Sequence, residues 1–290
     1  MTVVYLLIPA FLLLASVFGL PLLRYAWLSF HADSVLTGLQ PIANDGANWL
    51  RLMHDQRYWQ DLIQTLRFAF ASVGLELLLG LAIALLLHQP MRKRGLIRSA
   101  SLIPWALPTT VMALGWRWIF NTPYGPIDQF TSLSGISLNI LGNPSFAWIA
   151  LVYADVWKTT PFVALILLAG LQSIPNDLYE ACTLEGASSF TCFRKITLPL
   201  LKPYLGLAMT FRLAQAFGVF DLVQVMTGGG PASSTESLAL YAYWNALRFL
   251  DFGYSATIMI ASFVLLSTIV AFGWWLMILL NQRGSMAVTE

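Results

Sequence analysis

The sequence predicts an all-α membrane protein, a polytopic bundle of six transmembrane helices. Its apolar content is 58% and its mean hydropathy is +0.69, while only 10% of its residues are charged. Soluble domains contain about 45–50% apolar and about 25% charged residues, so these values argue against a water-soluble fold. We expect residues 1–290 to form one membrane domain.

Six apolar stretches predict the spans. A helix needs about 20 apolar residues to cross a hydrocarbon core about 30 Å thick, because its backbone polar groups must be satisfied within the helix. Stretches of this length lie at residues 3–27, 65–87, 97–120, 146–171, 204–226 and 254–280. The first lacks a basic leader and is too long for a signal peptide, so we expect a retained span. Pro104 and Pro108 predict a kink in the third.

The connecting segments predict the orientation. Residues 31–64 and 121–145 are polar, and we expect both to be surface loops. Lys and Arg are concentrated instead in residues 88–98 and 172–203. With six spans these two basic segments lie on the same side as both termini, and the positive-inside rule makes that side cytoplasmic. The sequence therefore predicts a multi-pass protein of the bacterial plasma membrane with both termini in the cytoplasm.

Several function classes find no support in the sequence. The net charge of +2 is too small to suggest a nucleic-acid partner. Cys182 and Cys192 match no disulfide framework or metal-site spacing, so we expect two free thiols and no metal. The glycines at 228–230 precede Pro231 and no lysine follows, so a phosphate-binding loop is missing there. We expect a chain that is not an enzyme and binds no cofactor.

Polar side chains at membrane depth suggest a solute pathway. Asp155, Thr159 and Phe162 share one face of the fourth span, beside Pro161. Such a face offers hydroxyl-rich ligands both an acceptor and an apolar ring. In the simpler alternative, Asp155 pairs with Lys158 on the same helix, three residues later. A similar face on the fifth span carries Gln215 and Val219. The other ionisable residues in or near the spans are Glu76, Arg117, Arg212 and Asp221.

Residues 172–203, between the fourth and fifth spans, are too polar to cross a membrane. Pro175 suits the first turn of a helix and Gly186 suits its end. Ser188 or Ser189 can cap a second short helix that ends before Pro199. The pattern predicts two short cytoplasmic helices joined by a glycine bend, which dock on the chain's own bundle or on a partner.

A further pattern in this segment runs from Glu180, Ala181 and Cys182 through Gly186 to Ile196, Leu198 and Pro199. Its spacing resembles the EAA loop of the membrane subunits of bacterial ABC importers. Cys182 stands where alanine is usual and Glu185 where aspartate is usual, and both changes conserve size or charge. Residues 155–162, 172–175 and 226–231 also look like the carbohydrate-uptake branch, which includes the maltose and glycerol-3-phosphate permeases, and resemble the first of its two permeases. The matching loop residues are Glu180, Ala181, Cys182, Glu185, Gly186, Ile196, Leu198 and Pro199.

The resemblance implies the permease fold of a type I ABC importer and a set of partner chains. These are a second homologous permease, two ATPase subunits that bind ATP and Mg²⁺, and an extracytoplasmic solute-binding protein. The EAA loop would couple the chain to the ATPases, and the importer would move a sugar, glycoside or polyol by alternating access. We favour a neutral glycoside, because few cations lie in the spans. Solute contacts are implied at Asp155, Thr159, Phe162, Gln215, Ala216 and Val219.

The leading alternative is an ion-coupled secondary transporter of a small polar solute. Its ion-binding or titrating residues would come from Asp155, Lys158, Asp221 and Glu76. It would not need an ordered cytoplasmic helix with a glycine bend. An intramembrane enzyme is less consistent with the sequence, since no span carries a histidine cluster or a nucleophile with a plausible base.

Overall fold

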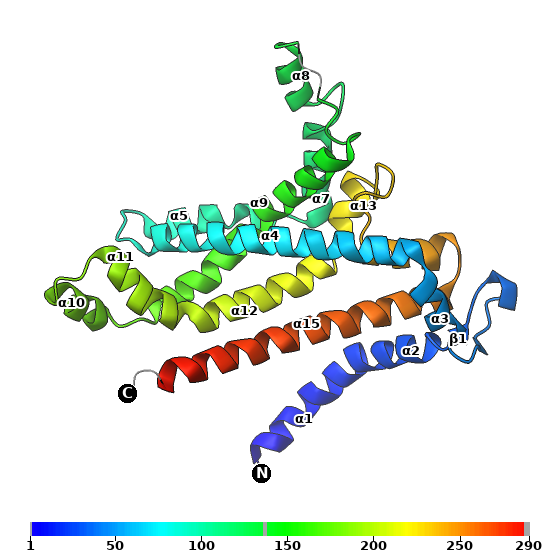
Figure 1. Ribbon diagram of the computed structural model, residues 1–290, viewed down its shortest axis with the longest axis horizontal. Coiled ribbons are helices and arrows are strands. Elements are labelled where there is room, and N and C mark those ends of the chain that lie inside the picture. The colour runs from blue at the N-terminus through cyan, green and yellow to red at the C-terminus, as the bar shows by residue number, and fades with distance from the viewer. Residues whose placement is uncertain (1, 136–137, 287–290) are drawn as a thin grey trace. The chain divides into compact units, whose positions relative to one another are not determined.

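The computed structural model describes residues 2–135 and 138–286 and is predominantly helical, as predicted (Figure 1). The chain forms two compact units, one from Met1–Ile63 with Glu236–Thr268 and one from Gln64–Thr235 with Ile269–Glu290. We call them unit 1 and unit 2. Residues 136 and 137 of the predicted loop 121–145, and the terminal residues 1 and 287–290, lie outside the described part.

Four of the predicted spans correspond to helices that are long and apolar enough to cross a membrane. They are Leu7–Leu28, Gln56–His88, Pro144–Gln172 and Phe252–Leu276. The third predicted span is divided into α5 (Arg94–Ser101), α6 (Ile103–Ala106) and α7 (Thr109–Ile119). Pro104 lies in the first turn of α6 and Pro108 caps α7, so the prolines interrupt the helix as expected.

The fifth predicted span is also interrupted. It begins within α12 (Leu198–Phe217), and a short α13 (Asp221–Met226) follows after residues 218–220. The backbone at Gly218 leaves the helical region, so the hydrogen-bond ladder stops there. The sequence predicted one continuous helix, because no proline marks this break. Six crossings therefore stay a prediction.

Residues 31–63 of unit 1 contain more secondary structure than the surface loop that their polar sequence predicted. The first helical segment consists of α1 (Thr2–Leu14), the π-helical turn η1 (Ala15–Gly19) and α2 (Leu20–Leu28). The predicted loop 31–64 instead contains a small hairpin and α3. The remaining elements are β1 (His31–Ala32) antiparallel to β2 (Ile42–Ala43), η2 (Val35–Thr37), α3 (Ala47–His54), α14 (Leu238–Tyr243), η4 (Trp244–Arg248) and the start of α15 (Phe252–Met286).

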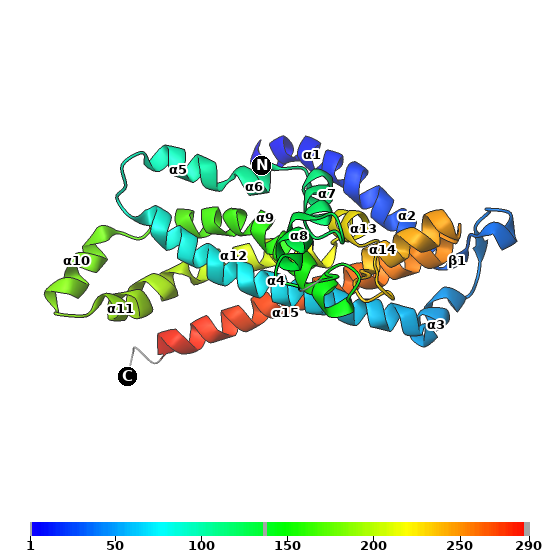
Figure 2. The ribbon, with the colours of Figure 1, turned by 90° about the horizontal axis from the view of Figure 1, so that it is seen from above.

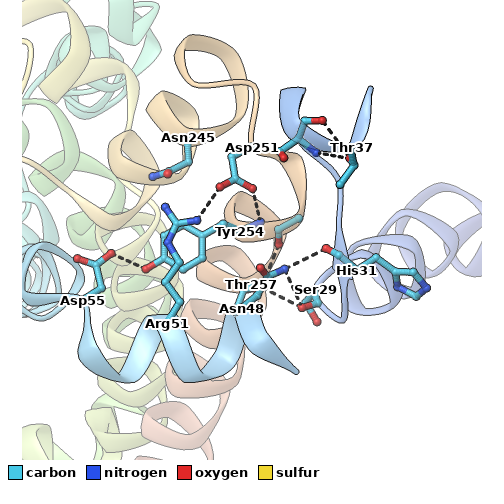
Figure 3. A network of polar contacts seen from close by, with 12 residues as sticks. Ser29, His31, Thr37, Asn48, Arg51, Asp55, Asn245, Asp251, Tyr254 and Thr257 are labelled. Atoms are coloured by element: carbon cyan, nitrogen blue, oxygen red, sulfur yellow. Dashed lines mark hydrogen bonds and ion pairs between the residues drawn. The ribbon is translucent and has the colours of Figure 1, made fainter. Parts of the chain in front are cut away.

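A polar network holds unit 1 together (Figure 3). Asn48 donates to the backbone oxygens of Ser29 at 3.3 Å and His31 at 3.0 Å. Arg51 pairs with Asp251 at 2.7 Å, and its guanidinium lies 3.7 Å from the ring centre of Tyr254. These contacts join α3 to the end of α2 and to the start of α15.

Asp55 is the acceptor at the centre of a second group of contacts in unit 1. The hydroxyls of Tyr241, at 2.6 Å, and Tyr254 both donate to its carboxylate. Burial alone would raise the pKa of Asp55, but these hydroxyls and the backbone N–H groups of Arg57 and Tyr58 outweigh it and lower that pKa. In turn, burial and the Asp55 carboxylate raise the pKa of Tyr241 to about 12.

Unit 2 is built on α4 (Gln56–His88), α9 (Pro144–Gln172) and α12 (Figure 2). A β-carbon added to Gly80 would lie 2.6 Å from Val163, so this glycine lets α4 and α9 approach closely. Shorter elements are α8 (Pro126–Ser132), α10 (Asn176–Leu184), α11 (Ser189–Cys192) and η3 (Phe193–Thr197). The fully buried aliphatic core joins the three long helices through Ala84, Leu87, Val163, Leu167, Leu168, Leu171, Leu201 and Ala208.

The Asp55 contacts predict a specific loss of stability. Asp55→Asn should lower the free energy of unfolding by about 1–3 kcal/mol, because it removes the charge that two hydroxyls and two N–H groups stabilise. Since the pKa of Asp55 is lowered in the folded protein, its contribution is complete above the ordinary pKa of about 3.9 and is lost as the pH falls through the folded value.

Thermal unfolding of the detergent-solubilised protein between pH 7 and pH 3 measures this effect. Asp45→Asn is the matched control, because Asp45 is exposed and its φ of 50° is tolerated by asparagine. Equal melting temperatures for Asp55→Asn and the control at pH 7 would contradict the prediction.

Candidate functional site

The most buried polar cluster of unit 2 centres on Arg212. This side chain is 2% exposed and donates to Glu76 through Nε at 2.5 Å and Nη2 at 2.9 Å. The same Nη2 donates to Asp155 at 3.0 Å. Arg212 thus joins α12 to α4 and α9, and we call Glu76, Asp155 and Arg212 the buried ion cluster. A charge inside an apolar bundle is costly unless it is paired and hydrogen-bonded, and this geometry meets both conditions.

Two of the predicted pathway residues extend this cluster. Thr159 donates to Glu76 at 2.7 Å, and Arg212 donates through Nη1 to the side-chain oxygen of Gln215 at 2.6 Å. Gln215 is exposed, whereas Thr159 is buried. The cluster therefore reaches from the centre of the bundle to an accessible amide on α12.

The remaining predicted pathway residues lie near the cluster in sequence but differ in environment. Phe162 stacks on Trp105 with ring centres 5.5 Å apart and meets Phe211 edge-on at 6.3 Å. Ala216 is buried at 2% exposure, and Val219 is half-buried in the break after α12. Phe162 therefore lies in an aromatic cluster with Trp105 and Phe211.

The alternative pairing of Asp155 with Lys158 is wrong in this structure. Asp155 pairs instead with Arg212, which is 57 residues away in the sequence. The sequence identified Glu76 and Arg212 as charges at membrane depth but did not bring them together. The contact between Arg212 and Gln215 could have been predicted, because helical spacing places residues three apart on one face. The pairing of Arg212 with Glu76 on α4 depends on how the helices pack, which the sequence does not show.

The loop at residues 172–203 has the predicted form of two short helices and a bend. The helix α10 ends before Gly186, whose φ of +72° favours glycine, and the side chain of Ser188 caps α11 by accepting from the Thr191 N–H. Figures 1 and 2 both show α10 and α11 at the end of unit 2 where α9 ends and α12 begins. Leu184 and Phe190 are 88% and 71% exposed. The loop thus presents two large apolar side chains on its exposed face.

The residues of the matching motif fall into two groups. Glu180, Ala181, Glu185 and Gly186 are exposed on α10 and at the bend. Ile196 packs against the core of unit 2, and Thr197 contacts Tyr179 of α10 at 2.9 Å through its hydroxyl. Leu198 is half-buried and Pro199 is exposed. One end of the loop is therefore anchored while the other presents its side chains to solvent.

The helix that leaves the loop is continuous with α12. Phe193 and Leu198, at the ends of η3, both have right-handed helical dihedrals, so residues 189–217 form one helical run. Arg212 lies 14 residues beyond Leu198, about 21 Å along the axis at 1.5 Å per residue. The exposed loop and the buried ion cluster thus lie on the same helical run, which contains the π-helical turn η3 and Pro203.

The two cysteines are bonded to each other, which corrects the expectation of free thiols. The Gly186 bend folds α10 back toward α11 and brings the Cα atoms of Cys182 and Cys192 to 6.2 Å, within the range that a disulfide needs. Sequence spacing gave no hint of this pairing, because the approach depends on the backbone at the bend.

Comparisons with known proteins identify relatives over almost the whole chain. Residues 76–283 match the family described as binding-protein-dependent transport system inner membrane component. The chain is 44% identical to the trehalose/maltose transport system permease protein MalF of Thermococcus litoralis, covering 90% of this chain and 88% of that protein. It is 37% identical to the sulfoquinovosyl glycerol transport system permease protein SmoG of Agrobacterium fabrum, covering 92% and 87%.

The fold is also found among solved structures. A crystal structure of a bacterial ABC transporter involved in the import of the acidic polysaccharide alginate gives a TM-score of 0.81 at 18% identity, covering 95% of this chain and 94% of that one. A second structure, of a bacterial alginate ABC transporter with a periplasmic protein bound to alginate pentasaccharide, gives 0.78 at 18% identity, covering 94% and 92%. At this identity the likeness supports the fold alone.

The buried ion cluster predicts a large penalty for removing its cation. Arg212→Met should lower the free energy of unfolding by about 3–5 kcal/mol, because it leaves two buried carboxylates without their counter-charge. Adding Glu76→Leu to Arg212→Met should restore part of the loss, since one of those carboxylates is then gone. Arg194→Met, on the exposed part of η3, should have little effect.

Thermal unfolding in lipid nanodiscs measures all three variants. A double variant less stable than Arg212→Met alone would contradict an ion pair between Glu76 and Arg212.

The disulfide predicts the reactivity of the loop. Protein purified without reductant should incorporate no maleimide, because neither sulfur is a thiolate, and two maleimides after reduction. Cys192→Ser should expose the half-buried Cys182 to labelling without reductant. Intact mass spectrometry counts the labels, and labelling of the unreduced wild-type chain would refute the pairing.

Proposed function

Because the chain belongs to the binding-protein-dependent transport system inner membrane components, we propose that it is a membrane-spanning permease subunit of an ATP-driven importer of sugars or glycosides. The proposal draws on the relatives, which are named for the transport of trehalose, maltose and sulfoquinovosyl glycerol. Family membership favours this function over the ion-coupled alternative.

The observation that carries the mechanism is the single helical run at residues 189–217. It begins in the exposed loop, passes the anchored Ile196 and ends beside Arg212 and Gln215. A continuous helical run passes a displacement of one end to the other, although Pro203 and the π-helical turn η3 let this one bend. A push on α10 and α11 would therefore move α12 against α4 and α9 at the buried ion cluster.

We assign the energy-coupling role to the exposed half of the loop. Glu180 would meet polar or basic groups of an ATPase subunit, Gly186 would provide the bend, and Leu184 and Phe190 would fill apolar hollows in that partner. Coupling also uses Ala181, Cys182, Glu185, Ile196, Leu198 and Pro199. ATP and Mg²⁺ would be bound by two such partner chains and not by this one.

We assign the solute pathway to the helix faces around the buried ion cluster. The exposed amide of Gln215 would contact hydroxyls of the solute, and Phe162 would offer an apolar ring to a sugar face. Asp155 and Thr159 would act as acceptor and donor once the helices part, with Ala216 and Val219 lining the space. Because Arg212 already pairs with both carboxylates, the buried ion cluster leaves no cation for an anionic solute, and the pathway suits a neutral glycoside.

The assembly would include a second, homologous permease and an extracytoplasmic solute-binding protein. Six crossings would place both termini and the loop 172–203 in the cytoplasm, where the ATPases are found. The solute-binding protein would dock on the opposite side, over residues 31–64, 121–145 and 227–253. Closure of the ATPase dimer on ATP would then open the pathway toward the solute-binding protein, and ATP hydrolysis would reverse it.

The test is a matched pair of glycine substitutions in the reconstituted complex. Gly186→Pro should abolish solute-stimulated ATP hydrolysis, because proline cannot adopt the φ of +72° and the bend is lost. Gly186→Asn is the control, since asparagine tolerates a positive φ and a β-carbon at this position meets nothing within 4 Å.

Phosphate release measures the stimulation, and co-purification of the subunits shows that each variant assembles. Full stimulation in an assembled Gly186→Pro complex would remove the coupling role from this loop. Uptake by the wild-type complex that continues without ATP but stops with a proton ionophore would overturn the importer assignment.

A further inference from the structure

A polar pocket in unit 2 is not used by the proposed mechanism. Its volume is about 300 Å³, and it lies between the first turns of α9, residues 64–67 of α4 and the segment just before Thr235. The lining residues are Gln64, Arg67, Pro144, Ser145, Trp148, Ile149 and Ser234. Small-molecule sites begin near this size, so the pocket can hold a single small ring.

Three polar atoms of residues that line this pocket are shielded from solvent and have no partner among the described residues. They are the side-chain oxygen of Gln64, the indole nitrogen of Trp148 and the hydroxyl of Ser234. Each such atom costs about 1–3 kcal/mol when it stays unsatisfied. If these side chains turn toward the pocket, a ligand that supplies both donors and acceptors removes this cost at all three positions.

Arg67 adds an uncompensated charge to the same pocket. Its guanidinium lies 5.4 Å from the ring centre of Trp148. Arg51, Arg57 and Arg212 each pair with a carboxylate, whereas Arg67 makes no ion pair within the described residues. The five N–H donors of its guanidinium are therefore available to a ligand oxygen.

The pocket is separate from the buried ion cluster, although both lie between α4 and α9. Arg67 precedes Glu76 by nine residues and Trp148 precedes Asp155 by seven. At 1.5 Å per residue these offsets place the pocket about 10–14 Å nearer the start of each helix. In the proposed topology this is the extracytoplasmic side, where a solute arrives.

We propose that this pocket is a second binding site, which takes one hydroxyl-rich ring of monosaccharide size before the ring reaches the pathway. Ring and hydroxyl oxygens accept from the exposed Arg67 and, once its side chain turns toward the pocket, from the indole N–H of Trp148. One hydroxyl of the ligand donates to the side-chain oxygen of Gln64. The hydroxyl of Ser234 either donates to the ligand or accepts from it. The inference rests on the proposed function for its solute class but not for its geometry.

Saturation-transfer NMR on the full chain in nanodiscs tests the site with D-glucose as the probe and D-glucuronate as its charged counterpart. Binding of D-glucose should weaken about tenfold in Arg67→Met and in Trp148→Phe, which keeps a ring but removes the N–H. The affinity for D-glucuronate should fall more than that for D-glucose in Arg67→Met, because a carboxylate binds a guanidinium more strongly than a hydroxyl does. Trp118→Phe, at an exposed tryptophan outside the pocket, should bind both probes like the wild type.

Two results would overturn the site. The first is that neither probe binds the wild-type chain. The second is that the probes bind elsewhere, which would appear as unchanged binding in both pocket variants or as a loss only in Gln215→Ala, in the solute pathway. If Arg67→Met does not fold, Trp148→Phe decides. Solute-stimulated ATP hydrolysis by the wild-type complex, measured in parallel, separates the two proposals, since it reports the importer whether or not the pocket binds a sugar.

Discussion

A single guanidinium inside an apolar bundle imposes the main constraint on unit 2. Arg212 is 2% exposed, and a cation at that depth is tolerated only with acceptors around it. Glu76 and Asp155 provide them, and in doing so they fix how α12 lies against α4 and α9. The apolar core at Leu87, Leu167 and Leu201 fills the space between the same three helices. Dispersion and burial provide most of the packing, while the ions determine which helix faces meet.

This constraint gives the exposed loop a defined point of action. The helical run at residues 189–217 cannot slide or rotate freely, because Arg212 is tied to two neighbouring helices. The opposite end of the run is tied to α10 by the disulfide and by the contact between Tyr179 and Thr197. Leu184 and Phe190 are left exposed between these anchors. A loop that is anchored at its base and apolar at its tip is suited to transmit force from a separate chain.

In unit 1, charged side chains are also stabilised by ion pairs and hydrogen bonds, but most of them are less buried than Arg212. Asp55 is stabilised by tyrosine hydroxyls and backbone N–H groups, and Arg57 meets Glu236 through bonds of 2.8 and 2.9 Å. These contacts join residues almost 200 positions apart, as between Arg51 and Asp251. They give a polar segment a fixed shape without a large apolar core. The polar pocket of unit 2 differs, because its arginine and its buried polar atoms are left unpaired.

The sequence by itself determined the features that depend on local pattern. Apolar runs near 20 residues gave the helical membrane class, Pro104 and Pro108 gave the broken third segment, and the pattern from Pro175 to Gly186 gave a short helix with a bend. The motif around Glu180 identified the family, since its spacing is read along the chain. Only the tertiary structure decided which distant groups meet. Arg212 finds Glu76 across 136 residues, and Cys182 reaches Cys192 only because the bend reverses the chain. Such pairings are set by packing between helices, which leaves no periodic signal in the sequence.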